Sequence, residues 1–281
     1  MKNKSDGLID LIFSEINGRT IAKRIYHEGN SRVSSNVHLP YENTPYYFLI
    51  NTGGGFIEGE TYEVNVTLLS HSHVIVTSQA PTYVYKCDNR IETGQKVSIH
   101  LEENSFLEYL TDEVIPYKNA VYSQETMIHM TPTSTLALID GVTAGWSEDE
   151  KDFQYSSVQM KTSIYMDKKL IYNDHSFLTP EKDDMRQLGF FEGHQNYNSL
   201  VVISHLCTND VIEKIKEKLS TLQIEVDFGL STLEKPGFIL RTMSDKGEKN
   251  RKVLMHALNI FRSLVFELPE LELNKNDHYF K

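Results

Sequence analysis

The sequence contains few cysteines and no long run of apolar residues. Only Cys87 and Cys207 occur in 281 residues, which excludes a secreted disulfide framework and a CxxC zinc site. Near the N-terminus the apolar residues are interrupted by Asp10, Ser14 and Glu15, so the apolar core of a secretion signal is absent. No stretch is apolar over the length that spans a bilayer. We therefore expect a cytoplasmic protein with no membrane partner.

Positive charge is also scarce. The 28 Lys and Arg residues are outnumbered by 39 Asp and Glu residues, and the formal net charge is −11. Sequence-independent binding of nucleic acid relies on basic patches, so we expect no nucleic-acid partner. The chain also lacks the Gly-Lys-Ser/Thr, HExxH and Gly-x-Ser-x-Gly signatures of phosphate loops, metalloproteases and serine hydrolases. The sequence predicts a protein that is not an enzyme and has no tightly bound cofactor.

Up to about residue 171, the chain consists of one short strand pattern after another. The alternation of apolar and polar residues from Tyr62 to Leu68 is typical of a strand with one buried face. Asn17-Gly18 is the dipeptide that best marks a two-residue hairpin turn. Segments such as Val-Ile-Val-Thr at 74–77 are apolar on both faces, which places them between two layers. The predicted strands are 8–16, 20–26, 32–39, 46–50, 62–68, 73–77, 82–85, 96–101, 106–110, 121–130, 135–139, 154–166 and 170–174.

The pattern changes after about residue 199. A strand over 200–204 precedes Thr208, the predicted N-cap of a helix with one apolar face. Strands over 223–228 and 237–242 then precede a second helix over 247–266, which ends before Pro269. We predict a mainly β protein with three parts. These are an all-β body (1–198), a C-terminal β-α-β-β-α subdomain packed on it (199–270), and a polar tail that frays (271–281).

A glycine-rich stretch joins two of the predicted strands. Gly54, Gly55 and Gly59 lie between the segment that ends at Ile50 and the strand that begins at Tyr62. A loop that binds phosphate needs a helix directly after it, whose free N–H groups meet the anion. A strand follows here instead. We therefore interpret the glycines as a tight corner that requires positive φ or close approach to a neighbouring strand.

Several short motifs follow one another in a set order along the β body. GGGFIEGE at 53–60 is followed by TSQA at 77–80, VYK at 84–86, LEY at 107–109 and DGVTAGW at 140–146. In order and spacing these motifs resemble the UreD family of urease accessory proteins, called UreH in some operons, over roughly residues 8–205. Two positions depart from the family pattern. Glu60 replaces the usual Asp and keeps the charge with a longer reach, whereas Tyr83 replaces the usual Lys and removes a cation.

The resemblance implies both a fold and a function. The implied fold is a wide, flattened helical coil of strands, a β-solenoid-like body, although no repeat of fixed period is visible in the sequence. The implied function is that of a urease maturation factor. It would dock the accessory proteins UreF and UreG, of which UreG is a GTPase, on the urease apoprotein. It would also assist nickel delivery, through an internal tunnel. Nickel would bind only transiently, because a transfer route needs sites that release the ion.

Two carboxylates are candidates for such a route. Glu60 and Asp140 each lie beside a glycine in a family motif, and a carboxylate that points into a wet interior attracts a divalent cation. The alternative for both is the capping of turns by hydrogen bonds. Gln79, Tyr83 and Tyr85 are candidates for a cavity lining or a partner surface, with buried cross-strand packing as the alternative.

Other polar residues give weaker signals. His71 and His73 lack further ligands nearby in sequence, so we expect them on an exposed turn rather than at a metal. His205 and Cys207 end a predicted strand, and we expect core packing there. Arg262 lies in the second predicted helix and is expected to pair with a carboxylate of the β body that the sequence does not identify.

Two functions of other classes stay open. A carbohydrate-active β-solenoid enzyme would use acids such as Asp112, Glu113 or Asp140, and its turnover would be lost when these are neutralised. A protein-binding β module with no metal role would keep urease activation after Glu60→Ala or Asp140→Ala, and would lose complex formation after changes at its surface.

Overall fold

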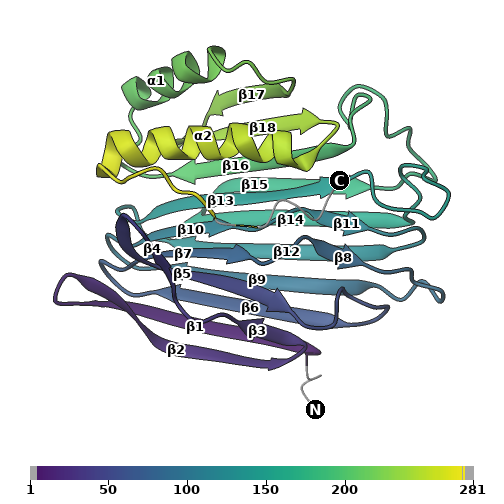
Figure 1. Ribbon diagram of the computed structural model, residues 1–281, viewed down its shortest axis with the longest axis horizontal. Coiled ribbons are helices and arrows are strands. Elements are labelled where there is room, and N and C mark those ends of the chain that lie inside the picture. The colour runs from purple at the N-terminus through teal and green to yellow at the C-terminus, as the bar shows by residue number, and fades with distance from the viewer. Residues whose placement is uncertain (1–4, 274, 276–281) are drawn as a thin grey trace.

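Two stacked β-sheets and two helices form three layers (Figure 1). The computed structural model describes residues 5–273 and 275. The first sheet has the strand order β15-β14-β12-β9-β6-β1-β2 and the second β17-β18-β16-β13-β10-β7-β5-β3. The elements are β1 (Gly7–Ile16), β2 (Arg19–Gly29), β3 (Ser31–Val33), β4 (Val37–Leu39), β5 (Glu42–Asn51), β6 (Thr61–Leu68), β7 (His73–Ser78), β8 (Thr82–Val84), β9 (Thr93–Leu101), β10 (Phe106–Leu110), β11 (Val114–Pro116), β12 (Val121–Met130), β13 (Thr135–Thr143), β14 (Ser157–Met166), β15 (Lys169–Leu178), β16 (Asn196–Ile203), α1 (Asn209–Ser220), β17 (Asp227–Thr232), β18 (Gly237–Ser244) and α2 (Gly247–Phe266).

The chain winds between the two sheets as a β-solenoid of about four turns. Each turn adds one strand to each sheet, so β6, β9, β12 and β14 pair in parallel in one sheet, and β5, β7, β10 and β13 do so in the other. The mainly β, solenoid-like fold is therefore confirmed. Tyr62, Gln95, Gln124 and Met160 occupy equivalent positions on adjacent strands. Their unequal spacing in sequence explains why no fixed repeat is visible.

Antiparallel hairpins cover the outer strands of the parallel stack in the first sheet. β1 turns into β2 at Asn17-Gly18, with φ of 53° and 76°, and β14 turns into β15 at Asp167-Lys168, with φ of 49° and 66°. Two positive φ angles in a row are typical of the tight turn that matches strand twist. The hairpin predicted at Asn17-Gly18 is confirmed.

Strands that are apolar on both faces lie in the middle layer. In β7, Val74 and Val76 point into a core between the two sheets, whereas Ile75 packs in a second core against the helices. Full burial of each such side chain stabilises the fold by about 1.5–3 kcal/mol. The members of the inter-sheet core include Leu11, Phe13, Val66, Leu68, Ile99, Leu101, Ile128, Leu136, Leu138 and Ile164.

The C-terminal elements extend the second sheet. β16 pairs with β13 and β18, so the sheet runs across residue 199, and the division predicted there stays a prediction. The β-α-β-β-α order is confirmed, with Thr208 as N-cap of α1 and α2 over Gly247–Phe266. The strand predicted over 223–228 is wrong in its first half. Ile224 and Val226 give an apolar alternation because both side chains pack against the second core. The backbone pairing of β17 with β18 begins only at Asp227.

Three further expectations need correction. The segment predicted as one strand over 32–39 forms two strands, β3 and β4. Between these two strands, the side chains of Ser34 and Asn36, rather than the backbone, accept hydrogen bonds from N–H groups of β5. The short β11 was not predicted. The tail does not fray at Leu271, which is buried, nor at Lys275, whose side chain is only 7% exposed. Residues 274 and 276–281 lie outside the described residues.

A buried ion cluster joins α2 to the second sheet. The guanidinium of Arg262 is fully buried and donates to the carboxylates of Glu42 on β5 and Glu108 on β10. His73 on β7 contacts Glu108 with 2.8 Å between its Nε2 and Oε1. Burial alone would raise the pKa of Glu108, but Arg262 and His73 hold this pKa below its ordinary value. Glu42 and Glu108 are the partners of Arg262 that the sequence left open.

We predict that Arg262→Met lowers the free energy of unfolding by about 3–5 kcal/mol, because the two carboxylates would stay buried without a counterion. Urea unfolding followed by circular dichroism measures this change. The matched control is Arg186→Met, which removes an exposed pair with Asp152 and should cost at most about 1 kcal/mol. A loss no larger than that of the control would contradict a supporting role for the cluster.

Candidate functional site

A cavity lies between the two sheets, next to the inter-sheet core, and exposed residues such as Gln79 and Ala80 form part of its lining. Its volume is about 200 Å³, which is room for several water molecules. On one side it borders the aliphatic residues Val64 and Val97, and on the other the aromatic residues Phe56 and Tyr62. We call this cavity the interior chamber. The solenoid is therefore filled by side chains over part of its length and hollow at this level.

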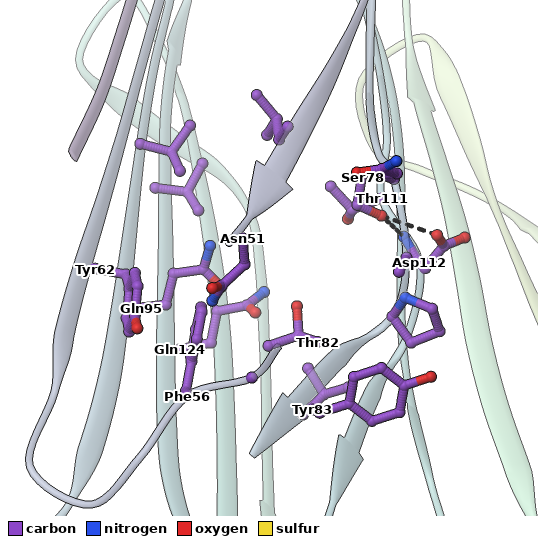
Figure 2. Close-up of a pocket in the computed structure, with 18 of the residues that line it drawn as sticks. Asn51, Phe56, Tyr62, Ser78, Thr82, Tyr83, Gln95, Thr111, Asp112 and Gln124 are labelled. Atoms are coloured by element: carbon purple, nitrogen blue, oxygen red, sulfur yellow. Dashed lines mark hydrogen bonds between the residues drawn. The ribbon is translucent and has the colours of Figure 1, made fainter. Parts of the chain in front are cut away.

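On the first sheet, the wall of the interior chamber changes from aliphatic at Val64 and Val97 to polar at Gln95 and Gln124, two residues further along the stacked strands. Gln95 on β9 and Gln124 on β12 lie side by side and point toward the middle of the chamber (Figure 2). The Tyr122 hydroxyl lies 3.0 Å from Oε1 of Gln95 and 3.1 Å from Oε1 of Gln124. The two amides are half-buried, and such partners lower the cost of removing them from water.

Asp140 is one of the two acidic residues that line the interior chamber, beside Asp112. It lies on β13 beside Gly141, and its Oδ1 accepts a hydrogen bond of 2.8 Å from the hydroxyl of Ser199 on β16. Burial raises the pKa of Asp140 to about 6, with Ser199 opposing the shift. Gly141 allows β16 to approach here, since an added Cβ would lie 2.2 Å from the Asn198 side chain. With this pKa, Asp140 is ionised near neutral pH, and a fall of about one pH unit is enough to protonate it.

The opposite wall separates the interior chamber from a larger groove. Both cavities are lined by Gln79, Ala80, Pro81, Tyr83 and Asp112, and the second has a volume of about 820 Å³. This outer groove lies beside the N-terminal end of α2, where Gly247 and Arg251 contribute to its lining. Figure 2 shows Ser78, Thr111 and Asp112 on this wall, with the carboxylate of Asp112 on the side of its strand away from Gln95 and Gln124.

The glycine corner closes one end of the interior chamber. Gly54 and Gly59 have φ of 74° and 79°, and a Cβ on Gly55 would lie 2.9 Å from the carbonyl oxygen of Tyr83. This close approach lets Phe56 bridge to β8, where its N–H donates to that carbonyl at 2.7 Å. The interpretation of the glycines as a corner is confirmed.

Glu60 lies at this corner but does not line either cavity. Its Oε2 accepts hydrogen bonds from the N–H of Ile57 at 3.0 Å and from the hydroxyl of Tyr62 at 2.6 Å. Asn30 donates to Oε1 at 3.3 Å. These are the contacts of a residue that caps a turn, and Tyr62 connects it to the interior chamber. A direct metal role of Glu60 stays a prediction.

Gln79, Tyr83 and Tyr85 are split between two surroundings. Gln79 and Tyr83 line both cavities, whereas Tyr85 donates its hydroxyl to the Gly54 carbonyl at 3.1 Å. Tyr83 and Tyr85 also pack edge-on against Tyr117, which in turn contacts the half-exposed Trp146. The structure thus places all three in or beside the wall, and their contact with a partner stays a prediction.

The structure brings together polar residues that sequence reasoning missed. Glu42, His73 and Glu108 place possible ligand atoms within 4.8 Å of one another, but Arg262 pairs with both carboxylates. His73 is therefore part of an ion cluster, and the expectation of an exposed turn is wrong for it. Asp112 and Glu113 are both paired with Arg251. The polar pair Gln95 and Gln124 broke an apolar alternation, which was the signal available in the sequence.

Fold and site together define a class: a two-sheet β-solenoid with a cavity between its sheets that acidic residues line. Within residues 5–273 and 275, neither helix has the length and apolar character needed to cross a bilayer. A family model described as UreD urease accessory protein matches residues 5–275. The chain therefore belongs to the UreD family of urease accessory proteins.

Individual relatives agree with this assignment. The urease accessory protein UreD of Streptococcus salivarius (strain 57.I) is 46% identical over 99% of each chain. The UreD protein of Streptococcus thermophilus (strain CNRZ 1066) is 46% identical over 97% of each chain. That of Bacillus cereus (strain ATCC 10987 / NRS 248) is 31% identical over 91% of this chain and 93% of its own. The similarity thus extends beyond the motifs into the C-terminal elements.

We predict that Asp140 makes the protein less stable as the pH rises from 4 to 7. In the unfolded chain its carboxyl ionises near 3.8, whereas the folded protein keeps the proton up to about pH 6. The stability that the protonated form contributes is complete below pH 4 and is lost as the pH rises through 6. The free energy of unfolding of Asp140→Asn relative to the wild type should therefore increase by about 3 kcal/mol over this range.

Urea unfolding at several pH values measures this difference. The control is Asp88→Asn, because Asp88 is exposed and pairs only with Lys86 at 3.2 Å among the contacts of the described residues. Its difference from the wild type should stay flat between pH 4 and 7. A flat profile for Asp140→Asn as well would mean that Asp140 is not held in a desolvated site.

Proposed function

We propose that this chain is a cytoplasmic urease maturation factor. It docks the accessory proteins UreF and UreG on the urease apoprotein and gives nickel a route through the interior chamber. Membership of the UreD family supports the role in urease maturation. The observation that supports the route is the position of Asp140 in a polar cavity that shares a wall with the outer groove.

The ligands of the interior chamber suit a route better than a storage site. Asp140 offers carboxylate oxygens, and Gln95 and Gln124 offer amide oxygens. Nickel binds most tightly to imidazole and thiolate ligands, so oxygen ligands hold it weakly. The pKa of Asp140, raised to about 6, also means that a proton competes for the carboxylate just below neutral pH. Nickel is the cargo in this proposal and not a resident cofactor, and the chain itself catalyses no reaction.

We expect Asp140→Asn to reduce nickel loading without loss of complex formation. The test uses purified apo-urease, UreF, UreG, GTP and nickel, with the wild-type chain or the variant. Asp140→Asn should co-purify with its partners, while the nickel content and the activity of urease fall to less than half. Asp210→Asn on the exposed face of α1 is the control and should load urease as the wild type does.

The result separates two functions. Normal nickel loading with Asp140→Asn would favour a protein-binding module without a metal route. In the same assay, Glu60→Gln distinguishes a nickel-ligand role of Glu60 from a turn-capping role. A ligand role predicts reduced loading with an unchanged free energy of unfolding, whereas a capping role predicts lower stability with loading retained.

A further inference from the structure

In the part of the chain that the structure describes, no helix covers the outer face of the first sheet. Both helices pack on the second sheet instead, so this face forms one side of the molecule (Figure 1). Val64 and Val97 point into the inter-sheet core, and their neighbours Glu63 and Lys96 therefore point outward. We call the surface formed by the outward side chains of β1, β6, β9, β12, β14 and β15 the open face.

Charges alternate along one rung of the open face. The pairing register places Glu63 on β6, Lys96 on β9, Glu125 on β12 and Lys161 on β14 at equivalent positions. Lys161 lies 3.4 Å from Glu125, and such cross-strand pairs stabilise the sheet within one copy of the chain. The row has a second property. Rotated by half a turn about its midpoint, it presents the opposite charge at every position.

We propose that the open face is an interface between two copies of this chain, related by a two-fold axis that lies in the interface and runs along the strands, between β9 and β12. This rotation places Lys96 against Glu125 of the second copy, and Glu63 against Lys161 of the second copy. Positions along the strands are kept, so each rung meets the same rung. The four charges lie within about 7 Å of the axis, and the angle of about 30° between stacked sheets shifts them by less than about 4 Å. Lys and Glu side chains are long enough to follow this shift.

The neighbouring rungs agree with the same axis. On the four parallel strands they carry no Lys, Arg, Asp or Glu, so no like charges meet there. The residues brought together are Asn65 with Ser163, Ser98 with Met127, Thr67 with Tyr165, and His100 with His129. Burial and the neighbouring His129 lower the pKa of His100, which therefore adds no positive charge near neutral pH.

The open face is large enough for a stable dimer. Its six strands span about 29 Å at the usual spacing and a strand of ten residues is about 33 Å long, so each copy buries roughly 900 Å². Stable protein interfaces bury about 1,200–2,000 Å² over both partners. Because the central contacts are between charges, we expect the dimer to weaken as salt screens them.

Sedimentation equilibrium of the full chain tests the interface, in buffer that contains EDTA so that no metal ion joins the histidines. The wild type should dimerise at low ionic strength at concentrations on the order of 100 µM, and should be monomeric in about 1 M salt. Lys96→Glu and Glu125→Lys each bring like charges together across the axis. Each should raise the dissociation constant of the dimer at least about tenfold.

A mixture of these two variants distinguishes an interface between copies from a ladder within one copy. In the mixed dimer, each reversed charge meets the opposite charge on the other chain, and the native Glu125 of one chain meets the native Lys96 of the other. The mixture should therefore recover the wild-type dissociation constant within about threefold. The cross-strand pairs within each chain stay broken in the mixture, so a ladder within one copy predicts no recovery.

The matched controls are Lys216→Glu and Glu213→Lys, which make the same charge reversals on α1, where the two residues pair with each other. Alone or mixed, they should dimerise as the wild type does. Circular dichroism and urea unfolding show that each variant is folded.

Three results overturn the proposal: a wild type that stays monomeric at low salt, charge reversals on the open face that leave the dimer unchanged, and a mixture that does not recover. If the wild type is monomeric and Lys96→Glu no longer co-purifies with the urease apoprotein or the accessory proteins, the open face belongs to one of those partners instead. Sedimentation of the chain alone requires neither nickel nor a partner, so its result does not depend on the proposed function.

Discussion

The buried guanidinium of Arg262 is the constraint on which the C-terminal half of the structure depends. It is fully buried between α2 and the second sheet, and it neutralises two carboxylates from strands far apart in sequence. A buried charge must be paired, so a shift of α2 along the sheet that separated these three groups would be costly. That placement sets the position of the N-terminal end of α2, and with it the outer groove and the path of the C-terminal segment.

The interior of the solenoid is governed by a different constraint. Parallel strands in register stack equivalent side chains into rungs, so a change of chemistry in one rung affects every strand at that level. Over most of the inter-sheet core the rungs are aliphatic, but at Gln95 and Gln124 two neighbouring strands carry amides. Amides do not pack as aliphatic side chains do and need hydrogen-bond partners, which Tyr122 supplies in part. The interior chamber is the consequence.

Both constraints meet at one wall. Asp140 lines the interior chamber, whereas the carboxylate of Asp112 points away from Gln95 and Gln124 (Figure 2). Gln79, Ala80, Pro81 and Tyr83 line both cavities. A route for a metal ion needs weak ligands that release it. In the function that we propose, the carboxylate of Asp140 is such a ligand, whereas that of Asp112 is paired with Arg251 and Lys275.

The sequence by itself determined most of the strands, the hairpin turn at Asn17-Gly18, both helices and the family, because period-two alternation, turn dipeptides, caps and motifs are local signals. Asp140 and Glu60 were singled out because each lies beside a glycine in a motif that resembles those of the family. Only the tertiary structure decided which carboxylates pair with Arg262, that Gln95 and Gln124 lie side by side, and that Lys275 reaches Asp112. These contacts join residues far apart in the chain, and their partners depend on the winding and register of the solenoid, which no local pattern carries.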